Sequence, residues 1–185
     1  MIRALRGVIC ALLHRILGLP GIHRLFWPIL RVDYTTRRID PDADLDALVA
    51  CVATLSNSRP ETIRHDFCLE FTEQDPQRWL FLIAKDPKGR VLGFARAMRQ
   101  GLKQDWWIVG LGVRPLLRRR GVGEALVNEV LARLRDGGVS KVHLEVNRAS
   151  QPAIELYRKL GFKEAPRFSE RTDKGDFLQM ALDLS

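Results

Sequence analysis

Apolar residues recur along this chain with two different periods, and the period changes several times between residues 33 and 184. Alternating or continuous apolar runs predict strands at 33–40, 78–86, 91–100, 105–115, 141–146, 163–168 and 177–184. Helical spacing predicts helices at 41–56, 59–71, 124–138 and 152–162. Gly89 is placed to make the tight turn of a hairpin, and Gly137 and Gly138 are placed to end the third helix. This order predicts a mixed α/β domain built on one sheet.

The first segment of the chain, residues 1–32, follows a pattern of its own. Its apolar residues repeat with helical spacing, and it holds five arginines and no acidic residue. Its uncharged apolar runs are shorter than the roughly 18 residues of a membrane span, and no cleavage site of the A-x-A type follows "GVICALL", so a signal peptide is not expected. Two alternatives stay open for residues 1–31: a helix packed on this domain or on a partner, or a basic helix lying on an anionic membrane. We predict a basic amphipathic arm at 1–32 and one domain at 33–185.

Composition and charge narrow the class of protein. The chain has 185 residues, of which 46% are hydrophobic and 28% charged, and this is typical of a globular protein. Three cysteines without a CxxC pair and four scattered histidines indicate neither a disulfide framework nor a metal site, and they suit a reducing cytoplasm. The formal charge of +8 is local, because residues 1–32 and the segment "RPLLRRR" together leave the rest of the chain close to neutral. No helix-turn-helix, RRM or zinc pattern accompanies this charge, so nucleic acid is not an expected partner.

The stretch "VRPLLRRRGVGEALV", Val113 to Val127, carries the strongest chemical signal. A strand, a loop and a helix start follow one another here, and the backbone N–H groups and the dipole at a helix start both favour an anion. Gly121 and Gly123 allow a ligand to approach the backbone closely, and the neighbouring arginines can add charge-assisted hydrogen bonds. The turn therefore predicts a phosphate site. It matches neither the Walker pattern nor the Rossmann fingerprint, which disfavours simple ATP or NAD binding.

Two motifs in this region resemble the GNAT acetyltransferase superfamily. The family loop that holds acetyl-coenzyme A reads Q/R-x-x-G-x-G/A after a strand ending in V-x-P, and this chain has "VRP" at 113–115 followed by Arg118, Gly121 and Gly123. Further on, "LEVNRASQPAIELYRKLGF" is similar to the family's LEV…A…LY…GF block. The resemblance covers roughly residues 34–184 and is closest to the ribosomal-protein alanine N-acetyltransferases. It implies an α/β (α+β) fold with a single mixed, mostly antiparallel sheet, splayed between its fourth and fifth strands and flanked by helices.

The resemblance also implies a set of site residues. Acetyl-CoA would be the acyl donor, without a metal, and its pantetheine arm would pair with the backbone of the strand that ends at Val113. The implied cofactor-binding residues are Leu111, Gly112, Val113, Arg118, Arg119, Arg120, Gly121, Val122, Gly123, Glu124 and Ser150. Many family members have Asn where this chain has Ser150, which is also placed to cap the following helix.

Tyr157 and Glu145 are the main candidates for proton transfer. By resemblance, the Tyr157 hydroxyl would protonate the departing thiolate, while packing on its helix is the alternative role. Glu145 falls where related enzymes place a base that takes the amine proton, with Asp105 as a second candidate, and a solvated strand residue is the alternative. The resemblance also implies that the first two helices and the last strand loop frame the acceptor, near the acidic residues Asp66, Glu70, Glu73 and Asp75.

Two functions of different classes follow from these observations. The first is an N-acetyltransferase that moves an acetyl group from acetyl-CoA to a primary amine, on a small molecule or a peptide N-terminus, by direct transfer in a ternary complex. The second is a non-catalytic module of the same fold that binds acyl-CoA and is attached by its N-terminal arm to a membrane or a partner. We expect a cytoplasmic protein in either case, peripheral to a membrane if the arm binds one. The sequence leaves the oligomeric state open.

Overall fold

The computed structural model describes residues 32–72, 75, 77–100, 105–166 and 176–184. Most of the predicted arm, including Cys10, lies outside the described residues. The strands are β1 (Thr35–Arg38), β2 (Trp79–Lys85), β3 (Val91–Gln100), β4 (Asp105–Val113), β5 (Lys141–Asn147), β6 (Lys163–Glu164) and β7 (Phe177–Asp183). The helices are α3 (Pro41–Val52), α4 (Pro60–Thr72), α5 (Val122–Asp136) and α6 (Gln151–Lys159), and a short 3-10 helix spans Pro115–Leu117.

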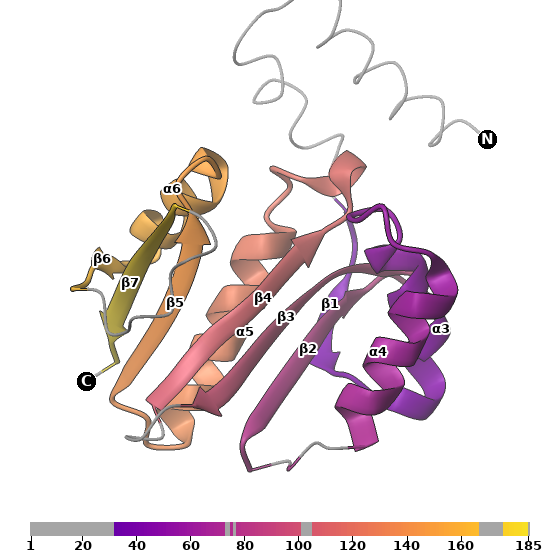
Figure 1. Ribbon diagram of the computed structural model, residues 1–185, viewed down its shortest axis with the longest axis horizontal. Coiled ribbons are helices and arrows are strands. Elements are labelled where there is room, and N and C mark those ends of the chain that lie inside the picture. Colours follow the sequence, from indigo (N-terminus) through magenta and orange to yellow (C-terminus); the bar gives the residue numbers. More distant parts are fainter. Residues whose placement is uncertain (1–31, 73–74, 76, 101–104, 167–175, 185) are drawn as a thin grey trace, which may run out of the picture. The chain divides into compact units, whose positions relative to one another are not determined.

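The described strands form one sheet in the order β1-β2-β3-β4-β5-β7-β6 (Figure 1). All neighbouring strands are antiparallel except β4 and β5, which are parallel. This arrangement requires a crossover between β4 and β5, and α5 makes it. The mixed, mostly antiparallel sheet flanked by helices confirms the expected fold class.

Strands β4 and β5 are paired over only part of their length and then separate. Only Trp106, Trp107 and Ile108 of β4 pair with β5, although β4 continues to Val113. The register between β3 and β4 shifts at the same place, where Arg96 pairs with Gly110 and Ala97 with Ile108, so that Val109 is an extra residue. A bulge of this kind bends its strand. The predicted splay is present, and β4 and β5 diverge toward their carboxyl ends in Figure 1.

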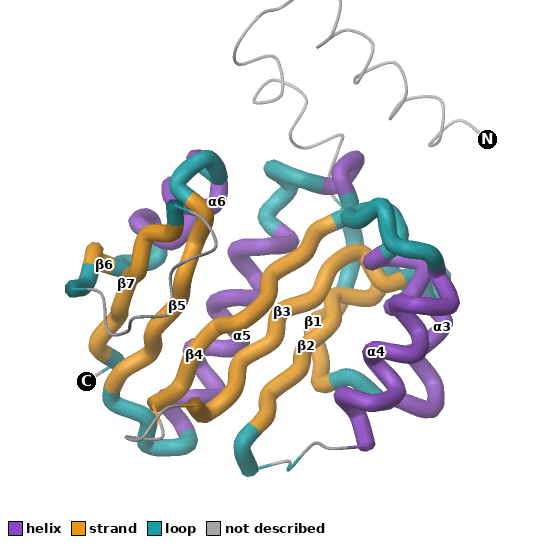
Figure 2. The backbone as a smooth tube through the Cα atoms, in the orientation of Figure 1, coloured by secondary structure: helices purple, strands orange, loops and turns teal. Residues whose placement is uncertain are grey.

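Helices cover the two faces of the sheet differently. On one face, α3 and α4 enclose a core with β2 and β3 that is rich in phenylalanine, including Phe67, Phe81 and Phe94. On the other face lies α5, whose buried residues Val122, Leu126, Val127, Val130, Leu131 and Leu134 follow helical spacing. Figure 2 shows α5 behind β4, with α3 and α4 in front of the first strands. The end of β4 therefore lies between two cores.

A buried charge ties the first strands to α3. Asp40 caps α3 by accepting hydrogen bonds from the N–H groups of Asp42 and Ala43. Asp44, one turn into the helix, has no exposed surface and accepts hydrogen bonds from Arg37 at 2.7 Å and Lys85 at 2.6 Å. Burial by itself would raise the pKa of Asp44, but these bonds and the N–H of Asp40 outweigh it and lower the pKa. The Asp44 carboxylate is therefore ionised at neutral pH, and its hydrogen bonds join α3 to β1 and β2.

Two elements differ from their predicted bounds. Helix α5 begins at Val122 rather than at Glu124, because Gly121 takes a left-handed conformation, with φ of 82°, and serves as the N-cap. Strand β6 has only two residues, Lys163–Glu164, although the N–H of Ala165 still donates to Gln179. Pro166 follows and has no N–H to extend this pairing. Residues 167 and 168 of the predicted strand lie outside the described residues.

Candidate active site

The start of α5 has the properties of an anion site. The N-cap residue Gly121 provides no side chain to cap the first turn, so the helix-start N–H groups are left open to a ligand. A Cβ atom built on Gly121 would meet only the Tyr34 hydroxyl, at 3.9 Å. A Cβ on Gly123 would make ordinary contacts with Val113, Leu156 and Leu111, at 3.5–3.9 Å. The end of β4, the first turn of α5 and α6 therefore meet at one place.

The four arginines of the loop do not act together. Arg114 turns back to the sheet, where its Nε donates to the carbonyl of Val91 at 2.7 Å. Arg118 and Arg119 are exposed, and Arg120 is half-buried. Arg119 has a φ of 59°, a left-handed conformation that is strained for a residue with a side chain. Arg118 Nε also donates to a backbone carbonyl, that of Val113, at 3.4 Å. The three arginines beside the helix start, 118–120, are the ones that could hold phosphate groups.

Two side chains that the motifs do not mark also border this site. Tyr34 precedes β1 and brings its hydroxyl near Gly121. Burial raises the pKa of Tyr34, and the negative charge of Glu124 raises it further, so the hydroxyl stays protonated and able to donate. Lys159 of α6 holds Glu124, with its Nζ at 2.7 Å from both carboxylate oxygens. No sequence pattern points to Tyr34, because it lies far from the loop along the chain.

Helix α6 carries the predicted proton donor and begins at the predicted cap. Tyr157 is 6% exposed, and its ring lies edge-on to that of Phe162 with the centroids 5.7 Å apart. Burial raises the pKa of Tyr157 to about 12. Ser150 is the N-cap residue of α6, yet its side chain makes no capping hydrogen bond and is exposed. Its hydroxyl is therefore open to another partner.

Glu145 lies at the point where the strands separate. It directly follows Leu144, the last residue of β5 that pairs with β4, and its side chain is exposed. Asp105 lies instead at the beginning of β4, where its carboxylate is 3.8 Å from Nε2 of the buried His143. Burial lowers the pKa of His143. The geometry brings Glu145, and not Asp105, to the edge of the splay.

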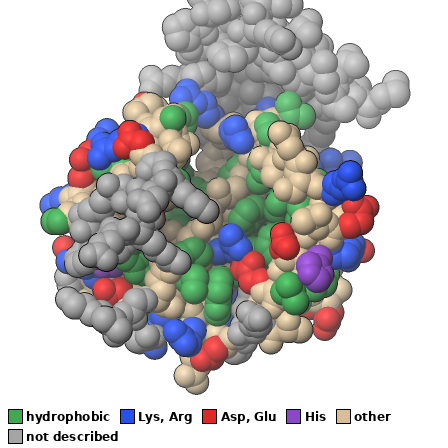
Figure 3. All heavy atoms as spheres, viewed as in Figure 1, with side chains coloured by type: hydrophobic (Ala, Val, Ile, Leu, Met, Phe, Trp, Pro, Cys, Tyr) green, Lys and Arg blue, Asp and Glu red, His purple; other side chains and the backbone are tan. Residues whose placement is uncertain are grey.

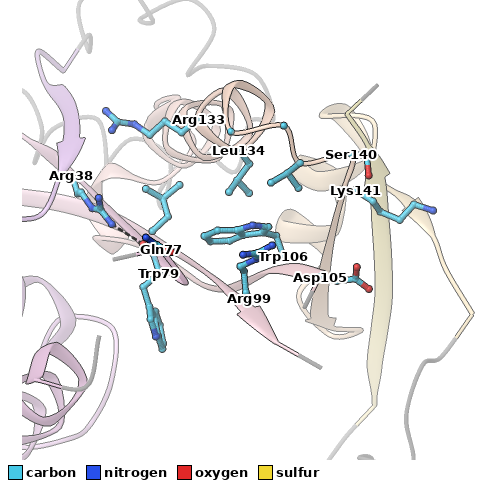
Figure 4. Close-up of a pocket in the computed structure, with 14 residues that line it drawn as sticks. Arg38, Gln77, Trp79, Arg99, Asp105, Trp106, Arg133, Leu134, Ser140 and Lys141 are labelled. Carbon is cyan, nitrogen blue, oxygen red and sulfur yellow. Dashed lines mark hydrogen bonds between the residues drawn. The ribbon is translucent and has the colours of Figure 1, made fainter. Parts of the chain in front are cut away.

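A cavity of about 570 Å³ lies at the opposite end of these elements (Figure 4). It is lined by the start of β4, including Asp105 and Trp106, and by the end of α5, including Arg133 and Leu134. None of the predicted cofactor-binding residues lines it. The cavity is thus separate from the start of α5 and from the splay.

The described residues also carry information on metal sites, thiols and membrane spans. They contain no cluster of three or more His, Cys, Asp or Glu side chains arranged to hold a metal ion. Cys51, which is buried, and Cys68, which is exposed, are free thiols. Within the described part of the chain, no helix has the length and apolar character needed to cross a membrane.

Comparison with known proteins agrees with this geometry. The family model described as acetyltransferase (GNAT) family matches residues 22–162. The chain belongs to the GNAT acetyltransferase family. This confirms the family resemblance drawn from the loop and the "LEV" block.

Glu73 of the predicted acidic group lies outside the described residues, while Asp66, Glu70 and Asp75 are described.

Relatives of this GNAT chain include longer proteins. It is 35% identical over 144 residues to mycothiol acetyltransferase of Salinispora tropica, an alignment that covers 73% of this chain and 46% of that protein. It is 31% identical over 150 residues to mycothiol acetyltransferase of Saccharomonospora viridis, covering 74% and 49% respectively. The chain thus spans about half the length of the curated relatives it matches.

Solved structures share the fold. Ribosomal-protein-S18-alanine N-acetyltransferase of Escherichia coli has a TM-score of 0.63 at 25% identity, covering 83% of this chain and 95% of that one. PaiA N-acetyltransferase of Thermoplasma acidophilum, solved in complex with coenzyme A, has a TM-score of 0.64 at 18% identity, covering 82% and 99%. The second likeness is one of fold alone.

Proposed function

We propose that this GNAT chain is an N-acetyltransferase that moves an acetyl group from acetyl-CoA to a primary amine by direct transfer. The observation that carries the proposal is the coincidence of two features at the end of β4. The strand loses its β5 partner after Ile108, and it then leads into the uncapped, glycine-lined start of α5. Together they provide an open strand edge for an extended arm and a positive helix end for phosphates.

The residues present fit the acyl donor. The N–H groups of 121–124 and the arginines 118–120 would hold its phosphates, with Tyr34 as an additional donor. The open edge of β4 at Leu111, Gly112 and Val113 would hold the extended arm through backbone groups. The side chains of Leu111 and Val113 face α5, so backbone pairing does not disturb their packing. The exposed Ser150 hydroxyl lies uncommitted at the start of α6.

The chain's own residues would manage the protons. When bound, acetyl-CoA supplies an activated acetyl group that an amine can attack. The Glu145 carboxylate, at the edge of the splay, accepts a proton from the acceptor ammonium directly or through water. The Tyr157 hydroxyl holds a proton through the neutral range, because burial raises its pKa to about 12, and it donates that proton to the leaving sulfur. The two groups divide the work of base and acid.

The acceptor is proposed as a cationic primary amine. The curated relatives, which are named mycothiol acetyltransferases, favour a small-molecule amine, and the S18-alanine enzyme favours a peptide N-terminus. A subgroup close to the ribosomal-protein alanine enzymes therefore belongs to the proposal. So do a cytoplasmic location and an attachment of the arm, residues 1–31, to a membrane or partner.

Binding and turnover can be tested separately. Calorimetry with acetyl-CoA, ATP and NAD measures donor selectivity, and release of free thiol in the presence of an amine library measures transfer. We expect binding of acetyl-CoA alone, weakened by salt because of the arginines, and thiol release with a subset of amines. Binding of acetyl-CoA without thiol release from any amine would favour the non-catalytic module, and failure to bind acetyl-CoA would overturn both functions.

A further inference from the structure

An ion pair crosses from α4 to β3 on the face of the sheet that α3 and α4 cover. Arg96 Nη1 donates to Glu70 Oε2 at 2.6 Å, and the side chains are only 26% and 16% exposed. The guanidinium of Arg96 also lies 6.0 Å from the ring centre of Phe67 and 5.9 Å from that of Phe81. Cation–π contacts and the ion pair together hold these charged groups in one place.

Each residue of the ion pair has one polar atom that forms no hydrogen bond within the described part of the chain. Glu70 Oε1 and Arg96 Nε are buried, and neither has a hydrogen-bond partner among the described residues. A buried carboxylate oxygen without a donor is unfavourable, and native structures rarely leave one without a reason. A ligand that brings its own N–H donors is such a reason.

The ion pair lies beside the splay. Arg96 pairs across the strands with Gly110, at the bulge, and a Cβ atom on Gly110 would lie only 2.9 Å from Arg96 Nε. Gly110 is two residues past Ile108, where β4 loses its β5 partner, and Glu145 follows Leu144 on the other side of the opening. Three features therefore lie close together: the end of the pairing between β4 and β5, the bulge at Val109, and the oxygen Oε1 of Glu70 that lacks a hydrogen-bond donor.

The ion pair lies on the face of the sheet that α3 and α4 cover. Figure 3 shows this face, and its middle is hollowed, with hydrophobic side chains on the floor and basic and acidic side chains next to one another beside it. The start of α5 adjoins the opposite face, because Gly123 is next to Leu111 and Val113, whereas Gly112 faces Phe94. The acyl donor and the acceptor can therefore meet at the splay from different sides.

We infer that Glu70 binds the ammonium group of the acceptor through Oε1, and that Arg96 is the residue that positions Glu70. The inference rests on the proposed function and assigns the acceptor class as an amine that arrives protonated. An ammonium group supplies the N–H donors that Oε1 lacks, and a charge-assisted hydrogen bond of this kind is among the stronger ones. Glu70 then binds the acceptor, while the proton acceptor is Glu145.

Steady-state kinetics tests the role of Glu70 with three amines: L-alaninamide, putrescine and glucosamine. Glu70→Gln keeps the shape and an oxygen for Arg96 but removes the charge, so KM for the amine should rise by about 10- to 100-fold while acetyl-CoA affinity stays unchanged. Glu61→Gln is the matched control, since Glu61 lies in the first turn of α4 and is exposed, and it should change KM by less than about threefold. Arg96→Lys keeps the charge without the planar group and should raise KM more than it lowers kcat.

A binding measurement separates this inference from the proposed function. The Arg96 Nε–H signal is followed by NMR in the CoA-bound chain during titration with each amine, and with N-acetyl-L-alaninamide as a probe without an ammonium. A saturable shift with an amine, absent with the acetylated probe and absent in Glu70→Gln, supports the inference even if no thiol is released. No shift with all three amines, or an unchanged KM in Glu70→Gln, overturns it. If Glu70→Gln does not fold, Glu70→Asp is used, and a KM equal to that of the parent overturns it equally.

Discussion

Replacing Tyr157 with phenylalanine removes one hydroxyl from a buried side chain and leaves its ring. The ring packs edge-on against Phe162 and is 6% exposed, so the variant should keep the fold. Because burial raises the pKa of Tyr157 to about 12, only about one hydroxyl in 10⁵ is ionised at pH 7. Loss of this proton donor should lower turnover by about 10²-fold. Acetyl-CoA affinity should change little, since the proposed phosphate site is at the start of α5.

The same burial predicts an effect on alkaline stability, and its sign follows from linkage. The folded-state pKa of about 12 is above the unfolded value of about 10, so the folded chain holds the proton more tightly. Tyr157 leaves the free energy of unfolding unaffected below about pH 10. Between about pH 10 and 12 it lowers that free energy by about 1.4 kcal/mol per pH unit, or about 2.7 kcal/mol in all. Tyr157→Phe should lack this loss.

Three measurements check this prediction. Thiol release from pH 6 to 10 gives turnover, and any basic limb in that range should be the same in parent and variant, because Tyr157 is still protonated there. Denaturant unfolding above pH 9 gives the stability difference. Ultraviolet titration of phenolate is simple to assign, since the chain has two tyrosines and the variant keeps only Tyr34. Parental turnover in the variant, or titration of Tyr157 near pH 10, would refute the reasoning.

Two further changes test the anion site and the buried anchor. Gly121→Ala and Gly138→Ala both place a side chain at a left-handed φ, 82° and 76°, and each should cost about 1–2 kcal/mol of stability. Only Gly121→Ala should weaken acetyl-CoA binding in calorimetry, by about 10-fold or more, and equal losses in both would contradict the phosphate site. Asp44→Asn should lower the free energy of unfolding by about 3 kcal/mol at neutral pH in urea. Because the pKa of Asp44 is lowered by Arg37 and Lys85, the parent should lose this advantage as the pH falls through the acid range, and a parent and variant with the same acid dependence would exclude the role of Asp44.

Local sequence patterns predicted most of the strands and helices. They did not predict which strands pair with one another, because that depends on contacts between distant residues. The period of 3.6 locates α3 to α6, because one face of each helix is buried. Continuous apolar runs locate β2 and β3, which are buried on both faces. The position of β7 between β5 and β6 joins residues 141–147 with 177–183, and no local pattern records such a contact. Helix propensity did not predict that α5 begins at Val122, because glycine is unfavourable inside a helix. Gly121 is instead favourable as the N-cap, where its backbone is left-handed.

The candidate site divides along the same line. Gly121, Gly123 and the arginines are adjacent in sequence, so one motif is enough to predict that they share a site. Glu70, Arg96 and Gly110 come from three elements, and only the bulge at Val109 brings Arg96 over Gly110. The arginines of the loop also make contacts that the sequence does not show, because Arg114 turns back to the sheet and donates to the carbonyl of Val91. Arg114 and Arg118 thus donate to the carbonyls of Val91 and Val113, around the end of β4. Arg119 and Arg120 complete the run next to the start of α5, where the phosphate site is proposed.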